Sequence, residues 1–396
     1  MVTISCSAKL HAFALAEQLE RKGLLDEFDT TFASGKNNWL KKFVRRNDRE
    51  SIPPEKIHTN TWLAFPVKLW QAKIYYWNNL FDHWVAGRIE KRRSRIFIGW
   101  SGMSLHSIRA AKKNGMITIL ERGSSHILLQ HKILQEEYRK FEIEFSVPLA
   151  IRQKEMDEYR EADFISVPSF FVRDSFLEQG IDPGKLFMNP YGTSTGFSMT
   201  SRTIEKDANR KFRILYLGAV SIRKGLIYLF EAISTLNIPE QDYEVWFIGN
   251  VEPALKPSIM KYNRPNWTWW GRIDHYELPE YIRQCDVGVQ PSLEEGLSMV
   301  IPQMMGCGVP LIASTNSGGS NLITDGENGF IVPIRDPAAI AEKIEFIFRH
   351  QDLLTGMKDK AGASAKQGFT WNDYGDRYAA FIQKILPAAV PHYASA

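Results

Sequence analysis

The stretch DVGVQPSLEEGLSMVIPQMMGCGVP, residues 286–310, carries the strongest indication of the fold in this chain. It opens with a short, mostly apolar run, Asp286–Gln290, and continues through Pro291 and Ser292 into a turn and then a segment rich in small residues. A short apolar run bounded by turn residues is typical of a buried strand, and the segment after the turn favours a helix. The stretch therefore predicts a strand–turn–helix unit.

The same alternation of apolar runs and helical patterns occurs along the rest of the chain. The runs that predict further buried strands are Val2–Ser5, Arg95–Gly99, Met116–Leu120, Phe164–Val167, Phe212–Leu217, Glu244–Ile248, Val309–Ala313 and Gly329–Val332. The helical patterns are Leu10–Lys22, Ser104–Asn114, Ser169–Gln179, a segment from Gly225 and Trp371–Leu386. Continuous apolar strands that alternate with helices predict an α/β fold whose parallel sheets are covered on both faces.

The length of 396 residues indicates two domains, since one domain usually has about 100–200 residues. The polar stretch Ser198–Arg210 has no apolar period and is the predicted linker. We therefore expect two Rossmann-like doubly wound domains, residues 1–200 and 201–375, that face a cleft at the carboxyl ends of their strands. A C-terminal helix within residues 376–396 is expected to return to the first domain.

Composition excludes several classes of protein. Hydrophobic residues make up 44% of the chain and charged residues 24%, which is close to an average globular protein and unlike a disordered or fibrous one. Cys6, Cys285 and Cys307 form no CxxC pair or Cys/His cluster, so neither a zinc site nor a disulfide framework is indicated. We see no signal-peptide pattern and no apolar stretch of the roughly 18 residues needed to span a bilayer. A cytoplasmic protein, soluble or peripheral on a membrane, is expected.

Positive charge is concentrated in one region. Residues 36–113 hold 17 Lys and Arg against 5 Asp and Glu, a net charge of +12. Residues 1–35 hold 3 basic and 5 acidic residues (−2) and the remainder 29 and 35 (−6), so the three parts sum to the +4 of the chain. A basic region on an otherwise mildly acidic chain indicates an anionic surface or partner.

The turn that follows Gln290 is the first candidate binding site. Backbone N–H groups at a helix start favour anionic oxygens, and a carboxylate just before them accepts hydrogen bonds from hydroxyl groups. Gln303 lies eight residues after Glu295, about two helical turns, so both are expected to face one ligand. The alternative is that Glu294 and Glu295 only cap a helix, which the flanking segments PS, EG, GCGVP and DGENGF make less attractive.

Two further clusters follow predicted strands. Gly218-Ala-Val-Ser-Ile-Arg-Lys-Gly225 lies between a strand and a helix, where a phosphate site belongs, and Arg223 and Lys224 supply positive charge there. The alternative for this basic pair is an ordinary solvated turn. Glu121-Arg-Gly-Ser-Ser-His126 follows a strand of the first domain, and either Arg122 or His126 is placed to approach a ligand. The alternative for His126 is an ordinary residue at a helix start.

These motifs resemble those of family 4 glycosyltransferases, which have the GT-B fold and retain the anomeric configuration. The resemblance spans nearly the whole chain and is strongest from Phe212 to Pro337. It implies that Glu295 contacts the donor sugar and that Lys224 neutralises the donor diphosphate. It also implies that the first domain binds the acceptor and the second the nucleotide sugar.

Two positions depart from the family pattern. Gln303 stands where a second Glu would bind the ribose hydroxyls; its amide can still donate and accept, without the strength of a charged group. Ala219 stands where an Arg is expected, and Arg223 is inferred to supply that charge. The candidate catalytic residues are Glu295, His126 and Arg122. The candidate donor-binding residues are Gly218, Arg223, Lys224, Gly271, Arg272, Glu295, Gly296, Leu297, Ser298 and Gln303.

The resemblance implies a retaining transferase that moves a hexose-type sugar from a nucleoside diphosphate sugar to a hydroxyl of a glycan or lipid-linked acceptor. Such reactions build cell-surface polysaccharides and glycoconjugates. UDP is the favoured nucleotide and GDP the second choice. No Asp-x-Asp motif is present, so no metal ion or other cofactor is expected. The alternatives are a GT-B phosphorylase, a nucleotide-sugar epimerase and a non-catalytic protein that binds sugar nucleotides.

Residues 61–95 combine aromatic and basic side chains. This combination is typical of a membrane–water interface, and many related enzymes with lipid-linked acceptors dock there. For the aromatic residues, such as Trp62 and Trp84, a core-packing helix is slightly favoured. For the basic residues from Arg88 through Arg95, contact with the inner face of a membrane is slightly favoured. No recognised nucleic-acid module accompanies the charge, so nucleic acid is not an expected partner.

Overall fold

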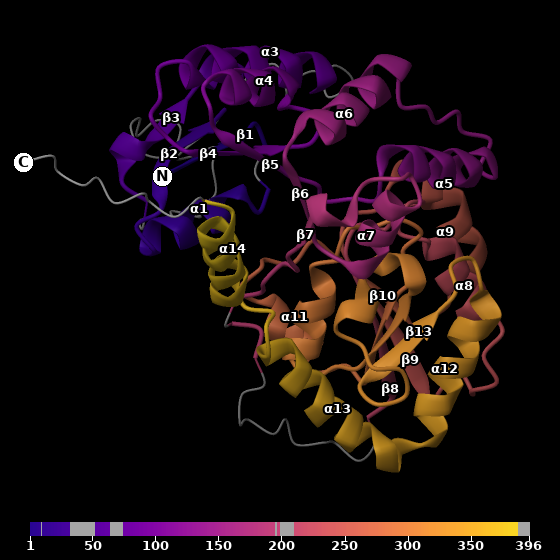
Figure 1. Ribbon diagram of the computed structural model, residues 1–396. Helices are drawn as coiled ribbons and strands as arrows, with labels where there is room; N and C mark the ends of the chain where they lie inside the picture. Colours follow the sequence, from indigo (N-terminus) through magenta and orange to yellow (C-terminus); the bar gives the residue numbers. More distant parts are fainter. Residues whose placement is uncertain (9, 32–51, 64–73, 195, 199–209, 387–396) are drawn as a thin grey trace, which may run out of the picture. The chain divides into compact units, whose positions relative to one another are not determined.

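The structure is a computed structural model that describes residues 1–8, 10–31, 52–63, 74–194, 196–198 and 210–386 (Figure 1). The chain divides into two compact units. The first comprises residues 1–99, 106–118 and 371–396, and the second comprises residues 100–105 and 119–370. Residues 199–209 of the predicted linker, and residues 36–51 and 64–73 of the predicted basic region, lie outside the described residues. The predicted domain boundaries stay a prediction.

The described strands form two parallel sheets. The seven-stranded sheet has the order β3-β2-β1-β4-β5-β6-β7 and the six-stranded sheet the order β10-β9-β8-β11-β12-β13. The strands of the first sheet are β1 (Val2–Cys6), β2 (Leu25–Thr30), β3 (Ile57–Thr59), β4 (Ile96–Trp100), β5 (Ile117–Glu121), β6 (Phe164–Val167) and β7 (Leu186–Met188). The strands of the second are β8 (Phe212–Leu217), β9 (Tyr243–Ile248), β10 (Trp267–Gly271), β11 (Val287–Gln290), β12 (Leu311–Ser314) and β13 (Gly329–Val332). The predicted α/β class and the predicted strands are confirmed.

The helices of the first unit include both ends of the described chain. They are α1 (Ala12–Arg21), α3 (Ile74–Ile89), α4 (Leu105–Lys113) and α14 (Trp371–Ile385), with the short 3-10 helices η2 (Pro54–Lys56) and η3 (Thr61–Leu63). Helix α14 packs against α1, so closely that a Cβ added at Gly375 would lie 2.5 Å from Cβ of Gln18. An ion pair between Lys22 and Asp376 joins the same two segments. The C-terminal helix therefore belongs to the first unit.

The helices of the second unit cover both faces of the six-stranded sheet (Figure 1). On one face, Phe230 of α8 (Leu226–Ser234) and Ile344 of α12 (Pro337–Arg349) belong to one apolar core with Val245 and Phe247 of β9. On the other, a Cβ added at Gly288 of β11 would lie 2.8 Å from Sδ of Met304, in α11 (Val300–Gly306). The remaining helices are α5 (Ile127–Arg139), α6 (Leu149–Glu161), α7 (Phe170–Leu177), α9 (Lys256–Tyr262), α10 (Leu278–Ile282) and α13 (Gln351–Lys366), with η5 (Pro183–Lys185), η6 (Pro253–Leu255), η7 (Thr315–Ser317) and η8 (Gly319–Asn321).

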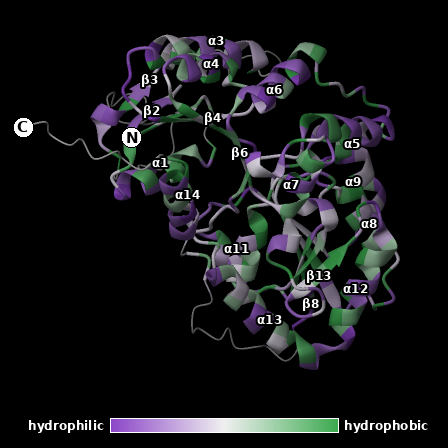
Figure 2. Ribbon diagram, in the orientation of Figure 1, coloured by the Kyte–Doolittle hydropathy of each residue, from purple (hydrophilic) through white to green (hydrophobic). Residues whose placement is uncertain are grey.

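Burial follows from this layering. Strands β11 and β12 are buried at every position, because helices cover both faces of their sheet. Helix α12 buries one stripe, which includes Ile340, Ile344 and Ile347, and leaves the rest of its surface to solvent. Figure 2 shows this difference as mainly hydrophobic colour on β13 and mixed colour along α5 and α12. The sheet interior therefore supplies a rigid support for the loops at its edge.

Candidate active site at the switch point of the second sheet

The candidate site lies where the strand order of the second sheet reverses. Strand β8 pairs with β9 on one side and with β11 on the other, and all these pairs are parallel. The loops after β8 and β11 therefore leave the same edge of the sheet side by side, which is where doubly wound sheets bind ligands. A hydrogen bond from Leu293 N–H to Arg223 O (3.0 Å) joins the two loops. The structure thus brings the Gly218–Gly225 motif next to the Glu295 motif.

Gly225 makes this close approach of the two loops feasible. Its φ is +68°, a left-handed conformation that side chains rarely adopt, and it directly precedes α8. A Cβ at this position would lie 2.2 Å from Pro291 O, far inside van der Waals contact. A residue with a side chain would push apart the loops that carry the basic pair and the acidic pair.

The central contact of the site is an ion pair between Lys224 Nζ and Glu295 Oε1. The side chains of Lys224 and Glu295 are 18% and 13% exposed, so the pair is largely withdrawn from solvent but reachable. Ion pairs of this kind are stronger than those on an open surface, because water screens them less. The two residues to which the resemblance assigns the diphosphate and the donor sugar are thus in direct contact.

Arg223 and Glu294, the neighbours of these two residues, form a second pair, in which the Glu294 side chain is fully buried and the Arg223 side chain is 35% exposed. Arg223 Nη2 lies 3.0 Å from Oε2 of Glu294 and 3.9 Å from Oε1 of Glu295, and Arg223 Nε donates to the backbone oxygen of Glu294 (2.9 Å). Burial lowers the pKa of Arg223, but the carboxylates of Glu294 and Glu295 raise it by more, so its net pKa is raised. Arg223 is therefore a charged group whose Nε and Nη2 already point to protein oxygens.

The segment after Glu295 differs from the prediction. Helix α11 begins only at Val300, and the residues before it form a loop. Glu295 N–H donates to Asn316 O (3.1 Å) and Ser298 N–H donates to Ser317 O (3.0 Å), so these hydrogen bonds hold the loop and use both donors. The spacing of Glu295 and Gln303 therefore does not correspond to two turns of one helix, and the expectation that both face one ligand stays a prediction. The backbone N–H groups of Glu295 and Ser298 also lie before the helix and are already hydrogen-bonded, so they do not form the predicted anion site.

The other predicted residues of this segment are buried. Leu297 is 3% exposed, and Ser298 Oγ accepts a hydrogen bond from Nε2 of Gln290 (3.1 Å). Gln303 lies within α11 with 8% exposure. Gly296 has no room for a side chain, since a Cβ would lie 2.1 Å from Gly123 O. This contact ties the Glu295 loop to the loop that follows β5.

Gly218 and Gly271, two predicted donor-binding residues, lie at the same edge of the sheet. Gly218 N–H donates to Ile248 O (2.9 Å) and Gly249 N–H donates to Gly271 O (2.7 Å), which joins the ends of β8, β9 and β10. Arg272 follows β10 and is exposed. Gly249 was not predicted, although a Cβ there would lie 1.8 Å from Gly218 O.

Arg122 is held in a buried network. It follows β5 and is 6% exposed. Its guanidinium donates to Oε2 of Glu155 (2.6 Å), to Ser125 O (2.8 Å) and to Oε1 of Gln130 (3.0 Å). Burial lowers its pKa, but the Glu155 carboxylate and other anionic groups raise it by more. Its donors are engaged by protein atoms, which favours a role in holding the loop after β5.

His126 is a buried residue at a helix start. It precedes α5, its Nδ1 accepts from Leu128 N–H (3.4 Å), and its own N–H donates to Oγ of Ser175 (2.9 Å). Its ring packs against Tyr159 and Phe176, each with ring centres 5.0 Å away. Burial, together with the charge of Arg122, lowers the pKa of His126 to about 4. The ring is therefore neutral at physiological pH, as the helix-start interpretation requires.

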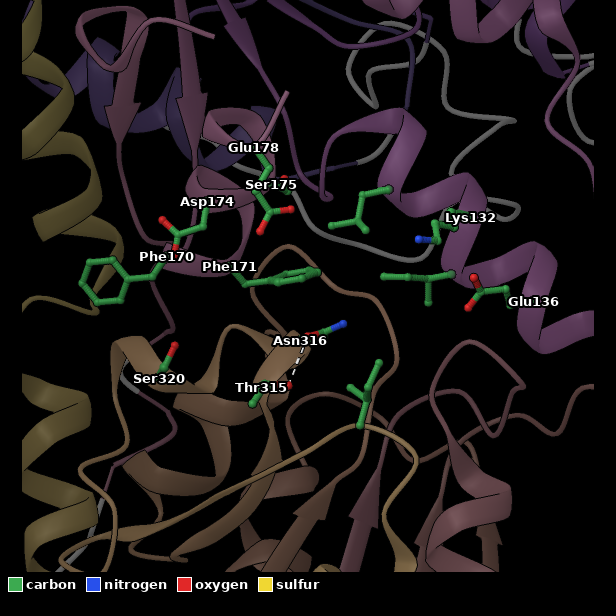
Figure 3. Close-up of a pocket in the computed structure, with 13 residues that line it drawn as sticks. Lys132, Glu136, Phe170, Phe171, Asp174, Ser175, Glu178, Thr315, Asn316 and Ser320 are labelled. Carbon is green, nitrogen blue, oxygen red and sulfur yellow. Dashed lines mark hydrogen bonds between the residues drawn. The ribbon is translucent and has the colours of Figure 1, made fainter. Parts of the chain in front are cut away.

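A pocket of about 530 Å³ adjoins the Glu295 loop (Figure 3). Figure 3 shows α7 and α5 on its two sides, with Thr315, Asn316 and Ser320 opposite them. Asn316 also donates from Nδ2 to Leu293 O (3.0 Å), so one residue borders both the pocket and the site. The pocket is lined by Leu129, Lys132, Ile133, Glu136, Phe170, Phe171, Asp174, Ser175, Glu178, Thr315, Asn316, Ser320 and Ile334. None of the predicted site residues lines it.

Sequence reasoning missed the contacts that connect these segments. Glu294 was considered only as a helix-capping residue, and Ser125, Gln130 and Asn316 were not considered at all. The signal that was available is the match between two adjacent bases, Arg223-Lys224, and two adjacent acids at positions 294 and 295. Among the described residues, no group of three or more His, Cys, Asp or Glu is arranged to hold a metal ion.

Comparison with known protein families identifies part of this chain. Residues 211–350 match the family described as "Glycosyl transferases group 1". A D-inositol 3-phosphate glycosyltransferase of Arthrobacter sp. is 30% identical over 190 residues, which cover 46% of this chain and 44% of that protein. An alpha-D-kanosaminyltransferase of Streptomyces kanamyceticus is 27% identical over 175 residues, which cover 43% and 45%. The chain spans somewhat less than half the length of these relatives.

Solved structures are similar over nearly the whole chain. Sucrose-phosphate synthase of Thermosynechococcus elongatus has a TM-score of 0.71 at 17% identity and covers 97% of this chain and 98% of its own. HepE of Anabaena, solved in complex with UDP, has a TM-score of 0.69 at 15% identity and covers 97% and 100%. At these identities the likeness shows the fold alone. The chain therefore has the GT-B fold of two Rossmann-like domains, and its residues 211–350 match glycosyl transferases group 1.

Proposed function

We propose that this chain is a retaining glycosyltransferase that moves a hexose-type sugar from a nucleoside diphosphate sugar to a hydroxyl of a glycan or lipid-linked acceptor. UDP is favoured over GDP. The observation that carries the proposal is the Lys224–Glu295 ion pair at the switch point of the second sheet. It sets a cation suited to a diphosphate beside a carboxylate suited to sugar hydroxyls. The match of residues 211–350 supports the same chemistry.

The proposed reaction is a front-side displacement. An acceptor hydroxyl oxygen bonds to the anomeric carbon on the face from which the diphosphate departs. The bond between that carbon and the phosphate oxygen breaks, its electron pair stays with the diphosphate, and a diphosphate oxygen takes the hydroxyl proton. Lys224 stabilises the negative charge that the diphosphate gains, and Glu295 orients the sugar ring. The proposal requires no metal ion, since Lys224 supplies positive charge.

We propose different roles for the predicted site residues. Glu295 and Lys224 are partly exposed and contact each other, so they are the residues that we assign to the donor. Arg122 and His126 are buried and bonded to protein atoms, so we assign them to the support of the loop that follows β5. The donor-binding assignment of Gly218, Gly271, Arg272, Gly296, Leu297, Ser298 and Gln303 stays a proposal.

The experiment that tests the function is a binding and turnover screen on the full chain. UDP, GDP, UDP-glucose and GDP-mannose are added separately, and the unfolding midpoint is recorded, since a ligand that binds only the native state raises it. Compounds that bind are then tested for release of nucleoside diphosphate with and without sugar acceptors. Binding with acceptor-dependent release supports the proposal. Conversion of the donor without acceptor indicates an epimerase, phosphate-dependent cleavage a phosphorylase, and binding without turnover a non-catalytic protein.

We also propose that the first unit contacts an anionic membrane surface on the cytoplasmic side. Among the described residues, no helix is both long and apolar enough to cross a bilayer. Trp62 of η3 is 86% exposed and Tyr76 of α3 is 58% exposed, and these two elements pack together. Of the basic residues from Arg88 through Arg95, Arg88 and Arg92 form ion pairs with Asp29, whereas Lys91, Arg93 and Arg95 are exposed. The exposed aromatic and basic residues together support this proposal.

A further inference from the structure

Glu294 is a fully buried carboxylate, with 0% exposure, beside the residue assigned to the donor sugar. Oε1 accepts hydrogen bonds from Ser125 N–H (2.8 Å) and from Ser125 Oγ (2.9 Å). Oε2 accepts from Nε2 of Gln130 (3.0 Å) and pairs with Nη2 of Arg223 (3.0 Å). A buried charge is tolerated only when it is paired and hydrogen-bonded, and Glu294 meets this condition at both oxygens.

These contacts join Glu294 to two parts of the chain that are distant from it in the sequence, residues 125–130 and Arg223. Ser125 belongs to the loop after β5, Gln130 to α5, and Arg223 to the loop after β8. Glu294 itself belongs to the loop after β11. One side chain thus fixes the loops that carry Lys224 and Glu295 against a common support.

The contact with Arg223 is made twice. Arg223 Nε donates to the backbone oxygen of Glu294 (2.9 Å), while Nη2 contacts its carboxylate. The backbone oxygen of Glu294 belongs to the peptide that leads into Glu295. The two contacts with Arg223 therefore set the direction in which the Glu295 side chain leaves the loop. The contact also pairs the charge of Arg223 with that of Glu294, as Lys224 is paired with Glu295.

We propose that Glu294 is a positioning residue of the donor site, which acts through Arg223 to orient Glu295 toward the donor sugar. This inference rests on the proposed function. Burial raises the pKa of Glu294, but the charge of Arg223 and the hydrogen bonds from Ser125 and Gln130 lower it by more, so the carboxylate stays charged. A purely structural role predicts a loss of stability alone. A positioning role predicts a loss of turnover in protein that is still folded.

The test compares two variants that each remove one buried negative charge. Glu294→Gln removes the negative charge that pairs with Arg223. Glu137→Gln is the matched control, since Glu137 is also 0% exposed and binds Arg335 Nε (2.8 Å) and Tyr228 Oη (2.7 Å), neither of which is a predicted site residue. Full-length proteins are assayed with UDP-glucose, or with whichever nucleotide sugar the wild type turns over. We expect kcat of Glu294→Gln to fall by at least about tenfold, with KM for the donor changed by less than about threefold.

A second variant keeps the test decisive if Glu294→Gln fails to fold. Gln130→Ala removes one anchor of Glu294 and leaves its contact with Arg223 intact, so it should lower kcat in the same direction by a smaller factor. Glu294→Asp, which keeps the charge with a shorter reach, should give an intermediate kcat. If Glu294→Gln, or in its place Glu294→Asp, has the kcat of Glu137→Gln, the positioning role is wrong while the proposed function stands. If the wild type turns over no nucleotide sugar, both fail.

Discussion

The Nζ atom of Lys224, in the loop after β8, is bound by the carboxylate of Glu295, in the loop after β11. The residue assigned to the donor sugar is therefore in direct contact with the cation assigned to the diphosphate. A diphosphate at this position would compete with the Glu295 carboxylate for Lys224. We therefore expect donor binding to weaken the ion pair and to make the Glu295 carboxylate more available to the sugar.

Replacing Glu295 should therefore raise the affinity for UDP, and replacing Lys224 should lower it. Glu295→Gln removes the competing anion, so the affinity for UDP should rise by about threefold to tenfold, the scale of a partly exposed ion pair. Lys224→Gln removes the cation, so the affinity for UDP should fall by at least about tenfold. Isothermal titration calorimetry with UDP measures both changes. Glu327→Gln, which breaks an exposed pair with Lys360, is the control. A loss of affinity in Glu295→Gln would contradict the competition for Lys224.

Gly296 should be intolerant of a side chain. A Cβ there would lie 2.1 Å from Gly123 O, so Gly296→Ala forces apart the loops after β5 and β11 and should cost about 2–4 kcal/mol of stability. Gly356→Ala is the control, because Gly356 lies in α13 with no atom within 4 Å of an added Cβ. That variant should gain about 0.5–1 kcal/mol from helix propensity. Thermal unfolding measures both, and equal effects would disprove the close contact.

His126 should make stability depend on pH in a defined window. In the unfolded chain its pKa is about 6.5, whereas burial and Arg122 lower the folded value to about 4. The unfolded state therefore binds more protons between these values, and the stability contributed by His126 is present above about pH 6.5 and lost as pH falls toward about 4. His126→Asn keeps a helix-capping acceptor but does not titrate there, so its stability should fall less over this range.

The measurement for this prediction is the unfolding midpoint at a series of pH values between 4 and 7. The control variant is His350→Asn, at an exposed histidine, which should follow the wild type. If His126→Asn loses stability as steeply as the wild type, the buried neutral state of His126 is refuted.

The exposed aromatic residues of the first unit should mediate vesicle binding. The double variant Trp62→Ser with Tyr76→Ser removes two of its exposed rings and should lower binding to phosphatidylglycerol vesicles by at least about tenfold, the scale of burying such rings in the interface. Co-sedimentation measures the bound fraction. Tyr276→Ser is the control, since Tyr276 is 79% exposed but belongs to the second unit. Equal binding by the double variant and the control would speak against membrane contact through these residues.

Much of the fold could be predicted because the strands are buried on both faces. Runs such as Phe164–Val167 and Phe212–Leu217 are apolar apart from Ser166 and Arg213, and the structure confirms both with the same bounds. The meeting of Lys224 and Glu295 also follows from the pattern, because both loops leave the carboxyl ends of neighbouring strands. Short strands with polar or partly exposed residues, such as β3 and β7, gave no such signal.

The partners within the site could not be predicted from sequence. Two adjacent carboxylates in a turn point in different directions, and the sequence does not show that Glu294 faces the interior while Glu295 stays partly exposed. The spacing of Glu295 and Gln303 suggested one helix, but hydrogen bonds to residues 316 and 317 hold the intervening loop until Val300. Likewise, the burial of Arg122 and His126 depends on Glu155, Ser175 and other residues that are distant in the chain.

The most direct test of the account is sugar transfer by the wild type and by Glu295→Ala, with Glu137→Gln as a control for folding. Each protein is given a panel of nucleotide sugars with glycan and lipid-linked acceptors, and product is measured by mass spectrometry. We expect transfer from one nucleotide sugar by the wild type and by Glu137→Gln, and a loss of at least about a hundredfold in kcat/KM for Glu295→Ala. Undiminished transfer by Glu295→Ala would contradict the placement of the donor site at the Lys224–Glu295 pair.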